Sequence, residues 1–230
     1  PERTMRWLRT VLSDLTELVR DNGGSIVDYT GDEIMAIWGA PEEIRDHAAR
    51  ACDTAIQMLE HLPKIDADWF DEVGVTTEVG IGINSGQAMV GNIGTNNRIK
   101  YGPLGNTVNL GSRVQGATKH LRTTLLITGH TRERLGSKWK KSQLRKLCEV
   151  RVKNILEPVE LIEIKSKQLE GWTKLRTRYE KALAHFENGE FQHASAILGQ
   201  LLVEFPEDGP SLLLMSRVVE AMLDEEGTFD

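Results

Sequence analysis

The sequence has little of what marks several large classes of protein. Its 230 residues include only two cysteines, Cys52 and Cys148, which form no CxxC pair. No apolar run approaches the ~20 residues that a membrane-spanning helix needs, and no signal peptide is visible. The formal net charge is −6, so the chain offers no basic excess for binding nucleic acid.

These absences predict a cytoplasmic protein with buried, reduced thiols. They exclude a disulfide-rich scaffold, and we expect no nucleic-acid partner and no membrane contact from this chain. The chain opens directly into a helical pattern at Pro1, which favours a piece of a longer protein. An upstream membrane anchor in that parent is compatible with this interpretation.

Apolar spacing predicts alternating helices and hairpins. Residues 5–19 show a helical period that ends at a glycine-rich cap, and the runs Ile26–Tyr29 and Ile34–Trp38 flank a Gly31-Asp32 turn. Helices are also expected over residues 41–62, 106–121 and 130–136, and strands within 75–94, 123–129 and 147–165. This alternation predicts an α+β fold with helices packed on one face of a sheet.

The pattern changes near residue 168. Residues 179–223 resemble one tetratricopeptide-like helical hairpin followed by a further helix. A single such unit cannot bury its own apolar face, so it should pack on the main domain or on a partner protein. We therefore expect two domains, residues 1–168 and 169–230.

Four motifs in order carry a family resemblance. They are TGDEIMAIW, EVGIGINSGQAMVGNIG, YGPLGNTVNLGSRVQG and EVRVKNILEPVEL. Together they resemble the signature of class III adenylyl and guanylyl cyclases, from Pro1 to about Lys165. The resemblance implies a ferredoxin-like (βαββαβ-type) sheet, antiparallel-rich, with helices packed on it. It also implies a phosphorus–oxygen lyase that makes a 3′,5′-cyclic nucleotide and pyrophosphate for intracellular signalling.

The resemblance also implies roles for four residues. Asp32, at the hairpin tip, matches a metal-binding aspartate, and two Mg²⁺ or Mn²⁺ ions are expected per site. Asn109 and Arg113 share one helix face because they are four residues apart. They match the ribose-orienting asparagine and the arginine that stabilises the pentavalent phosphorus. Lys153, expected on the penultimate strand, matches a lysine that contacts the β- and γ-phosphates.

The family pairs two catalytic domains head to tail. By that resemblance Asp32 of one subunit works with Asn109, Arg113 and Lys153 of the other, in a homodimer with shared active sites. The family's other metal aspartate lies on a first strand ahead of the first helix, and that strand is absent from this sequence. The chain alone is therefore expected to be inactive or nearly so.

Base recognition is unusual in this sequence. Adenylyl cyclases usually carry Lys at the position of Asp28 and Asp or Thr at that of Gly102, whereas guanylyl cyclases carry Glu and a small residue. A carboxylate can accept from guanine N1–H and the 2-amino group but cannot donate to adenine N1. GTP is therefore favoured over ATP, with a pyrimidine nucleotide as a further alternative.

Other functions stay open at this point. One alternative is an adenylyl cyclase with unusual base-reading residues, and another is a catalytically silent module that dimerises and signals through its helical tail. A diguanylate cyclase shares the GD hairpin but gives no reason for the NTVNLGSR motif. The tail is also a candidate site for a protein partner.

Overall fold

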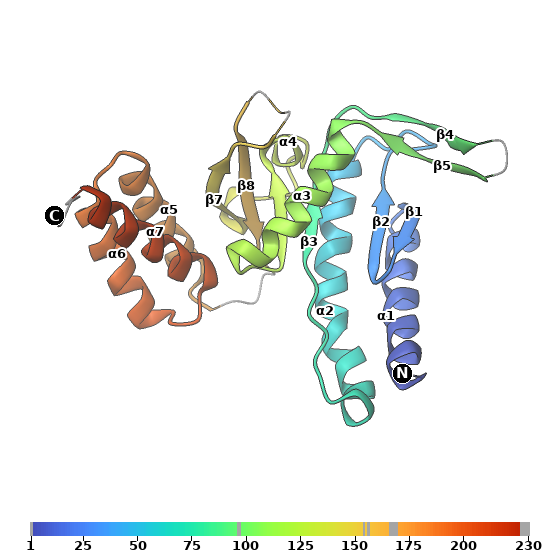
Figure 1. Ribbon diagram of the computed structural model, residues 1–230, viewed down its shortest axis with the longest axis horizontal. Coiled ribbons are helices and arrows are strands. Elements are labelled where there is room, and N and C mark those ends of the chain that lie inside the picture. Colours follow the sequence, from blue (N-terminus) through green and yellow to red (C-terminus); the bar gives the residue numbers. More distant parts are fainter. Residues whose placement is uncertain (1, 96–97, 154, 156, 166–169, 226–230) are drawn as a thin grey trace.

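The computed structural model describes residues 2–95, 98–153, 155, 157–165 and 170–225. An α+β portion is followed by three helices at the C-terminal end (Figure 1). In chain order the elements are α1 (Glu2–Asp21), β1 (Ser25–Thr30), β2 (Glu33–Ile37), α2 (His47–Val73), β3 (Ile81–Ile83), β4 (Met89–Thr95), β5 (Arg98–Leu104), α3 (Asn106–Leu121), β6 (Leu125–Thr128), α4 (Gly129–Arg132), the 3₁₀ helix η1 (Lys141–Gln143), β7 (Leu144–Val150), β8 (Val159–Ile164), α5 (Trp172–Glu187), α6 (Phe191–Glu204) and α7 (Gly209–Glu225).

The strands form three separate sheets within the described residues. The central sheet has the order β3-β6-β8-β7, with β3 parallel to β6 and the other pairs antiparallel. The hairpins β1–β2 and β4–β5 each stand as a two-stranded antiparallel sheet. The expected α+β architecture is thus confirmed, whereas the expected single sheet is divided, because no described strand joins β2 to β3.

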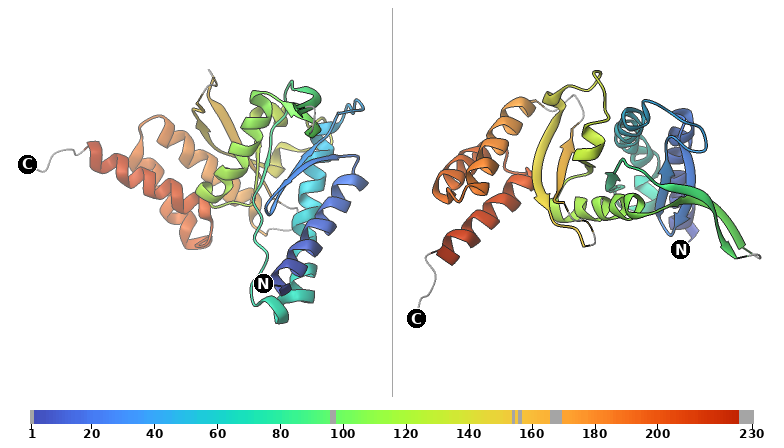
Figure 2. Two further views of the ribbon diagram at one scale, coloured as in Figure 1. Left: turned by 45° about the vertical axis from the view of Figure 1, so that its right-hand side comes forward. Right: turned by 90° about the horizontal axis from the view of Figure 1, so that it is seen from above.

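Helices α1 and α2 pack side by side at the hairpin end of the molecule (Figure 2). Their contact is apolar and includes Val11, Leu15, Leu62 and Ile65. The sequence predicts the second helix over residues 41–62, but α2 begins at His47 and continues through Pro63 to Val73. Among the described residues, none of the helices combines the length and apolar composition that a bilayer span requires.

Both cysteines are buried and unbonded, as the sequence predicts. Cys52 faces the core between α2 and the central sheet, and Cys148 lies in the core between the sheet and the C-terminal helices. Burial raises the pKa of both thiols, that of Cys148 to about 11. Both thiols are therefore protonated and unreactive at neutral pH.

The C-terminal helices pack on the central sheet through a buried charged network. Arg145 on β7 donates from Nε to Glu163 at 2.8 Å and from its two terminal nitrogens to Asp208 at 2.9 Å each. Its guanidinium also lies over the rings of Trp172 and Tyr179, and the Tyr179 hydroxyl donates to the Leu147 carbonyl. The sequence-based expectation that the tail packs on the main domain is confirmed.

The tail has three helices, as expected, and Tyr179, Leu198 and Val218 are buried in the core it shares with the sheet. The tetratricopeptide-like character and the boundary at residues 168/169 remain predictions. Residues 166–169 lie outside the described residues.

Gly82 on β3 allows α3 to lie against the sheet. A Cβ added to Gly82 would stand 2.1 Å from the backbone nitrogen of Gln115 and 2.7 Å from the carbonyl carbon of Val114. These distances are far shorter than van der Waals contact, and the obstructing atoms belong to the helix backbone. Position 82 therefore has room only for glycine.

Replacing Gly82 with alanine is expected to destabilise the protein by about 1–3 kcal/mol, because α3 must move away from β3. Gly116→Ala, on the same helix, is the matched control, since a Cβ there meets no atom within 4 Å. Gly116→Ala is expected to raise the free energy of unfolding by up to about 1 kcal/mol, because alanine has a higher helix propensity than glycine. Urea unfolding measures both, and equal stability of Gly82→Ala and wild type would contradict this packing.

Candidate active site

The β1–β2 hairpin presents Asp32 at its tip. Thr30 pairs with Glu33, so Gly31 and Asp32 form a two-residue turn. Gly31 has φ +66°, the positive value that the first central position of a type II′ turn requires. The Asp32 side chain is exposed. The hairpin and its turn are as the sequence predicts, and metal binding by Asp32 stays a prediction.

A β-bulge lies next to Asp28. Ile26 faces Ala36 and Asp28 faces Met35, which makes Val27 the extra residue. Bulges bend a strand and change the direction of neighbouring side chains. Here the Asp28 carboxylate forms an ion pair with Lys100 on β5.

The Lys100 ammonium, hydrogen-bonded to Asp28, lowers the pKa of that carboxyl below its usual value. Lys100 is missing from the sequence-based candidates. Two signals point to it: it precedes Gly102 by two residues, so the two share a face of β5, and its charge is opposite to that of Asp28.

Gly102 completes this group. It is buried and lies opposite Gly91 in the β4–β5 hairpin. A Cβ at position 102 would stand 3.0 Å from Cγ1 of Val27, the bulge residue beside Asp28. The structure therefore brings Asp28, Lys100 and Gly102 together, and we refer to these three residues as the base cluster.

Helix α3 presents Asn109 and Arg113. Both side chains are exposed, and their spacing places them on one face of the helix. The start of α3 is anchored by two hydrogen bonds: Asn84 donates to the Thr107 carbonyl at 2.9 Å, and the Thr107 hydroxyl donates to the Gln87 carbonyl at 2.5 Å. The helix thus holds the amide and the guanidinium in a fixed relation to the sheet.

Arg113 and Lys153 are brought together. A terminal nitrogen of Arg113 donates to the Lys153 carbonyl oxygen at 2.7 Å, and the Lys153 side chain is exposed. The sequence places Lys153 on the penultimate strand, but β7 ends at Val150 and Lys153 lies in the turn that follows. Asn154, where the sequence predicts the start of that turn, lies outside the described residues.

The candidate residues fall into two groups within one chain. The hairpins carry Asp32 and the base cluster, whereas α3 and the turn after β7 carry Asn109, Arg113 and Lys153. Among the described residues, no hydrogen bond or ion pair joins Asp28 or Asp32 to Arg113. The six residues predicted from the sequence therefore belong to two sets of elements: the two hairpins, and α3 with the turn after β7.

The β4–β5 hairpin projects from the body of the molecule (Figure 2). It carries exposed apolar side chains. Met89 is 77% exposed and Ile99 64% exposed, values unusual for large apolar residues. The other exposed apolar residues of the two hairpins are Tyr29, Met35, Tyr101 and Leu104.

Asp32 suits a hard divalent cation. Mg²⁺ at nucleotide sites is usually held by one or two carboxylates together with substrate phosphates. Asp32 supplies one accessible carboxylate, while Asp28 is engaged by Lys100. The described residues thus fit part of a magnesium or manganese site, with further ligands required from the substrate and from another carboxylate.

Comparison with known proteins identifies the family. Residues 1–165 match the adenylate and guanylate cyclase catalytic domain. The chain is 30% identical over 219 residues to the terminal-differentiation-specific adenylate cyclase of Dictyostelium discoideum, a match that covers 93% of this chain and 10% of that protein. It is 31% identical over 129 residues to adenylate cyclase 1 of Rhizobium meliloti (strain 1021), covering 56% of this chain and 19% of that protein.

A solved structure agrees with these matches. The guanylyl cyclase Cya2 is 29% identical and superposes with a TM-score of 0.63, over 74% of this chain and 85% of that chain. The chain spans a tenth to a fifth of the length of the two curated relatives above. With a family match over most of its length, the chain belongs to the adenylate and guanylate cyclase catalytic domain family.

Proposed function

We propose that this chain is the catalytic domain of a nucleotide cyclase, which converts a ribonucleoside triphosphate to its 3′,5′-cyclic nucleotide and pyrophosphate. The observation that carries the proposal is that Arg113, one turn after Asn109 on α3, hydrogen-bonds the backbone of the exposed Lys153, in a chain of this family. A guanidinium, an amide and an ammonium at one surface suit a triphosphate whose negative charge shifts during reaction.

Each residue has a role that its chemistry supports. Arg113 is always charged and its planar fork can hold two phosphate oxygens as the 3′-oxygen attacks the α-phosphorus. Asn109, one turn earlier, orients the ribose, and Lys153 neutralises the β- and γ-phosphates. Asp32 would hold a divalent cation, which lowers the pKa of the 3′-hydroxyl and neutralises phosphate charge when bound.

The active form is a head-to-tail homodimer. The exposed apolar side chains of the β1–β2 and β4–β5 hairpins support this assembly. Among the described residues, no hydrogen bond or ion pair joins Asp32 to Arg113 within one chain, which also fits a site shared between subunits. In the dimer, Asp32 and the base cluster of one subunit face Asn109, Arg113 and Lys153 of the other. The site requires a second metal carboxylate, and a strand placed between β2 and β3 would supply it and join the divided sheet.

The base cluster favours guanine. The Asp28 carboxylate also accepts hydrogen bonds from Tyr29 and Thr30, and its two oxygens have further lone pairs that can accept from guanine N1–H or the 2-amino group. The ammonium of Lys100, which contacts Oδ2, can donate to O6. Adenine presents the reverse order, an acceptor at N1 and a donor at the 6-amino group. GTP is therefore the proposed substrate.

ATP is the second candidate, because the two curated relatives described above are adenylate cyclases. With ATP, Lys100 rather than Asp28 would meet N1. The two candidates differ in which group of the ion pair lies nearer to N1, and substitution of Lys100 separates them.

Lys100→Ala is expected to lower kcat/KM for GTP by at least about tenfold, because guanine O6 loses its donor. The exposed Lys138 provides the matched control as Lys138→Ala, with no change expected. The measurement is kcat/KM of both variants with each of the four ribonucleoside triphosphates. A loss for ATP without a loss for GTP would instead assign Lys100 to adenine N1.

Exchange of the base-reading residues should move preference toward ATP. The variant combines Asp28→Lys with Gly102→Asp, and with Val27→Ala because a Cβ at position 102 would crowd Val27. The introduced ammonium could then donate to adenine N1 and the introduced carboxylate could accept from the 6-amino group. If the GTP-to-ATP ratio stays unchanged, these positions do not read the base.

The activity itself is tested by incubating an N-terminally extended form of the protein with Mn²⁺ and all four ribonucleoside triphosphates. The expected products are a 3′,5′-cyclic mononucleotide and pyrophosphate, identified by mass. A cyclic dinucleotide would assign the protein to diguanylate cyclases. No product from a well-folded dimer would favour the silent signalling module.

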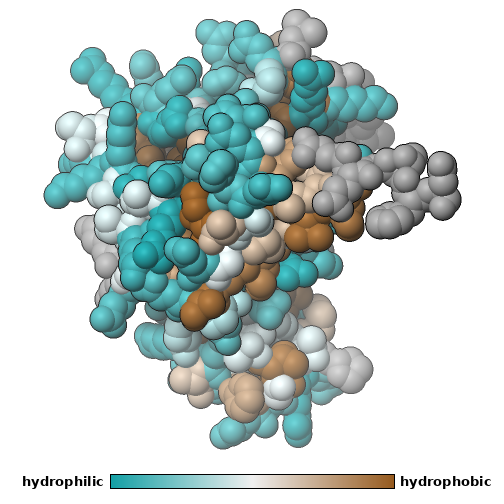
Figure 3. All heavy atoms as spheres, turned by 90° about the vertical axis from the view of Figure 1, so that its left-hand side faces the viewer, coloured by the Kyte–Doolittle hydropathy of each residue, from teal (hydrophilic) through white to brown (hydrophobic). Residues whose placement is uncertain are grey.

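The helical extension is also a candidate surface for a protein partner. Val203, Leu212, Val219 and Leu223 of α6 and α7 are exposed. Seen from the side of this extension, apolar side chains lie interspersed among hydrophilic ones (Figure 3). Such a surface suits contact with another protein better than contact with nucleic acid.

A further inference from the structure

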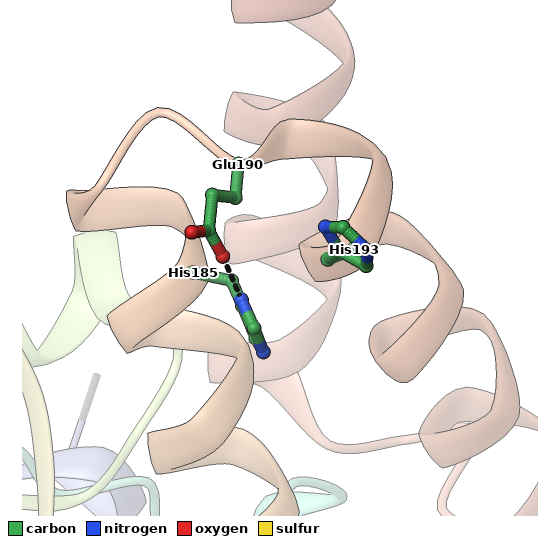
Figure 4. A group of neighbouring side chains, drawn as sticks. All are labelled: His185, Glu190 and His193. Atoms are coloured by element: carbon green, nitrogen blue, oxygen red, sulfur yellow. Dashed lines mark hydrogen bonds and ion pairs between the residues drawn. The ribbon is translucent and has the colours of Figure 1, made fainter.

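Three potential metal ligands meet where α5 gives way to α6. His185 lies in the last turn of α5, Glu190 directly precedes α6, and His193 is in the first turn of α6. Their ligand atoms all lie within 4.8 Å of one another. Figure 4 shows Glu190 turned toward His185, with the ring of His193 beside them.

The backbone holds these residues close together. Gly189, with φ +77°, reverses the chain between the helices, and the amide of Glu190 donates to the His185 carbonyl at 2.8 Å. Beside the cluster, the rings of Phe186 and Phe191 lie 5.6 Å apart between centroids and join the two helices. The spacing of the three ligands is thus built into the α5–α6 turn.

We propose that His185, Glu190 and His193 form a binding site for a divalent transition-metal cation of the zinc type. Two imidazole nitrogens and one carboxylate oxygen are a ligand set that zinc uses, at about 2.0–2.2 Å from the metal. Tetrahedral geometry then places ligand atoms about 3.3 Å apart. The cluster must tighten by about 1.5 Å, which rotation of partly exposed side chains can supply.

The ligand types separate this site from the cyclase metal. Imidazole favours zinc, copper and nickel, whereas Mg²⁺ prefers carboxylate, carbonyl and water oxygens. The Glu190 carboxylate is hydrogen-bonded to Nδ1 of His185, so these two groups already lie side by side, and the shared proton must be released if both atoms bind the ion. Both cysteines are buried and offer zinc no accessible thiolate. A bound ion would connect α5 to α6 and leave a fourth coordination position open to water or to a ligand from a partner.

The test is titration of metal-free protein with ZnCl₂ by calorimetry, followed by thermal unfolding. Wild type is expected to bind one Zn²⁺ per chain, and a hundredfold excess over Kd should raise the Tm by about 5–10 °C. His193→Gln should weaken binding at least about tenfold, as should His185→Gln. His130→Gln, an exposed histidine outside the cluster, should leave binding unchanged.

Co²⁺ provides a second readout, because a tetrahedral site with these ligands gives a visible absorption band that His193→Gln should abolish. Circular dichroism confirms that each variant retains its helices. The proposal is overturned if wild type takes up no stoichiometric Zn²⁺, or if His193→Gln and His185→Gln bind Zn²⁺ as strongly as wild type does. Mg²⁺ should neither compete for the site nor raise the Tm through it.

Discussion

Arg113→Ala is expected to lower kcat of the cyclase reaction by about 10²–10³-fold, with a much smaller change in KM. The guanidinium is assigned to charge that develops as the 3′-oxygen attacks phosphorus, so its loss falls on the transition state. The measurement is cyclic nucleotide formation by the N-terminally extended protein at saturating nucleotide and Mn²⁺.

Two variants make this prediction specific. Arg113→Lys keeps the charge but loses the planar fork, so we expect it to recover only a small part of the activity. Arg134→Ala removes an exposed arginine elsewhere and should change nothing. A nearly full-rate Arg113→Ala enzyme would show that α3 does not supply the phosphate-binding cation.

The second large effect is on stability. Arg145→Met is expected to lower the free energy of unfolding by about 3–5 kcal/mol, because two carboxylates at Glu163 and Asp208 lose their buried partner. The tail should loosen first, since Asp208 connects it to β7. Urea unfolding measures the loss, and hydrogen exchange in α5–α7 locates it.

The control is a surface ion pair. Arg132 contacts Glu160 with 41% of its side chain exposed, so Arg132→Met should cost less than about 1 kcal/mol. Equal losses in the two variants would mean that the Arg145 network is no more important than a surface pair.

The same network predicts a loss of stability in acid. Burial alone would raise the pKa of Asp208, but the hydrogen bonds from Arg145 and Ser211 bring it below the usual 3.8. A lowered folded-state pKa adds stability at pH values above 3.8, and that stability is lost as the pH falls through the folded-state value. Asp208→Asn should therefore make the free energy of unfolding less dependent on pH in this range. If the pH dependence is unchanged, other groups cause the loss of stability in acid.

Much of the fold follows from local patterns in the sequence. The Gly31-Asp32 hairpin, the cap after α1 and the three helices of the tail are set by turn residues and apolar spacing. The continuation of α2 through Pro63 is less visible, because proline usually marks a helix end and only tertiary packing overrides it. The strand β5 is also absent from the expected elements, since its glycine and proline have weak strand propensity.

The candidate site is predictable to a similar degree. Motif spacing identifies Asp32, Asn109 and Arg113, but Lys100, the partner of Asp28, comes from a different hairpin, and no local pattern shows that β1 and β5 meet. The Arg145 network joins residues 63 positions apart, so no local pattern indicates it. Long-range pairing of charges is set by the fold and not by neighbouring residues.

The most direct test of the shared site is to mix Asp32→Ala with Arg113→Ala, both made in the N-terminally extended protein. Each variant alone should be inactive, because both of its sites lack one required group. In a random mixture half of the dimers are mixed and hold one intact site, so about one quarter of the wild-type activity should return. A mixture that stays inactive beside an active wild type would contradict the account, as would turnover by an isolated wild-type monomer.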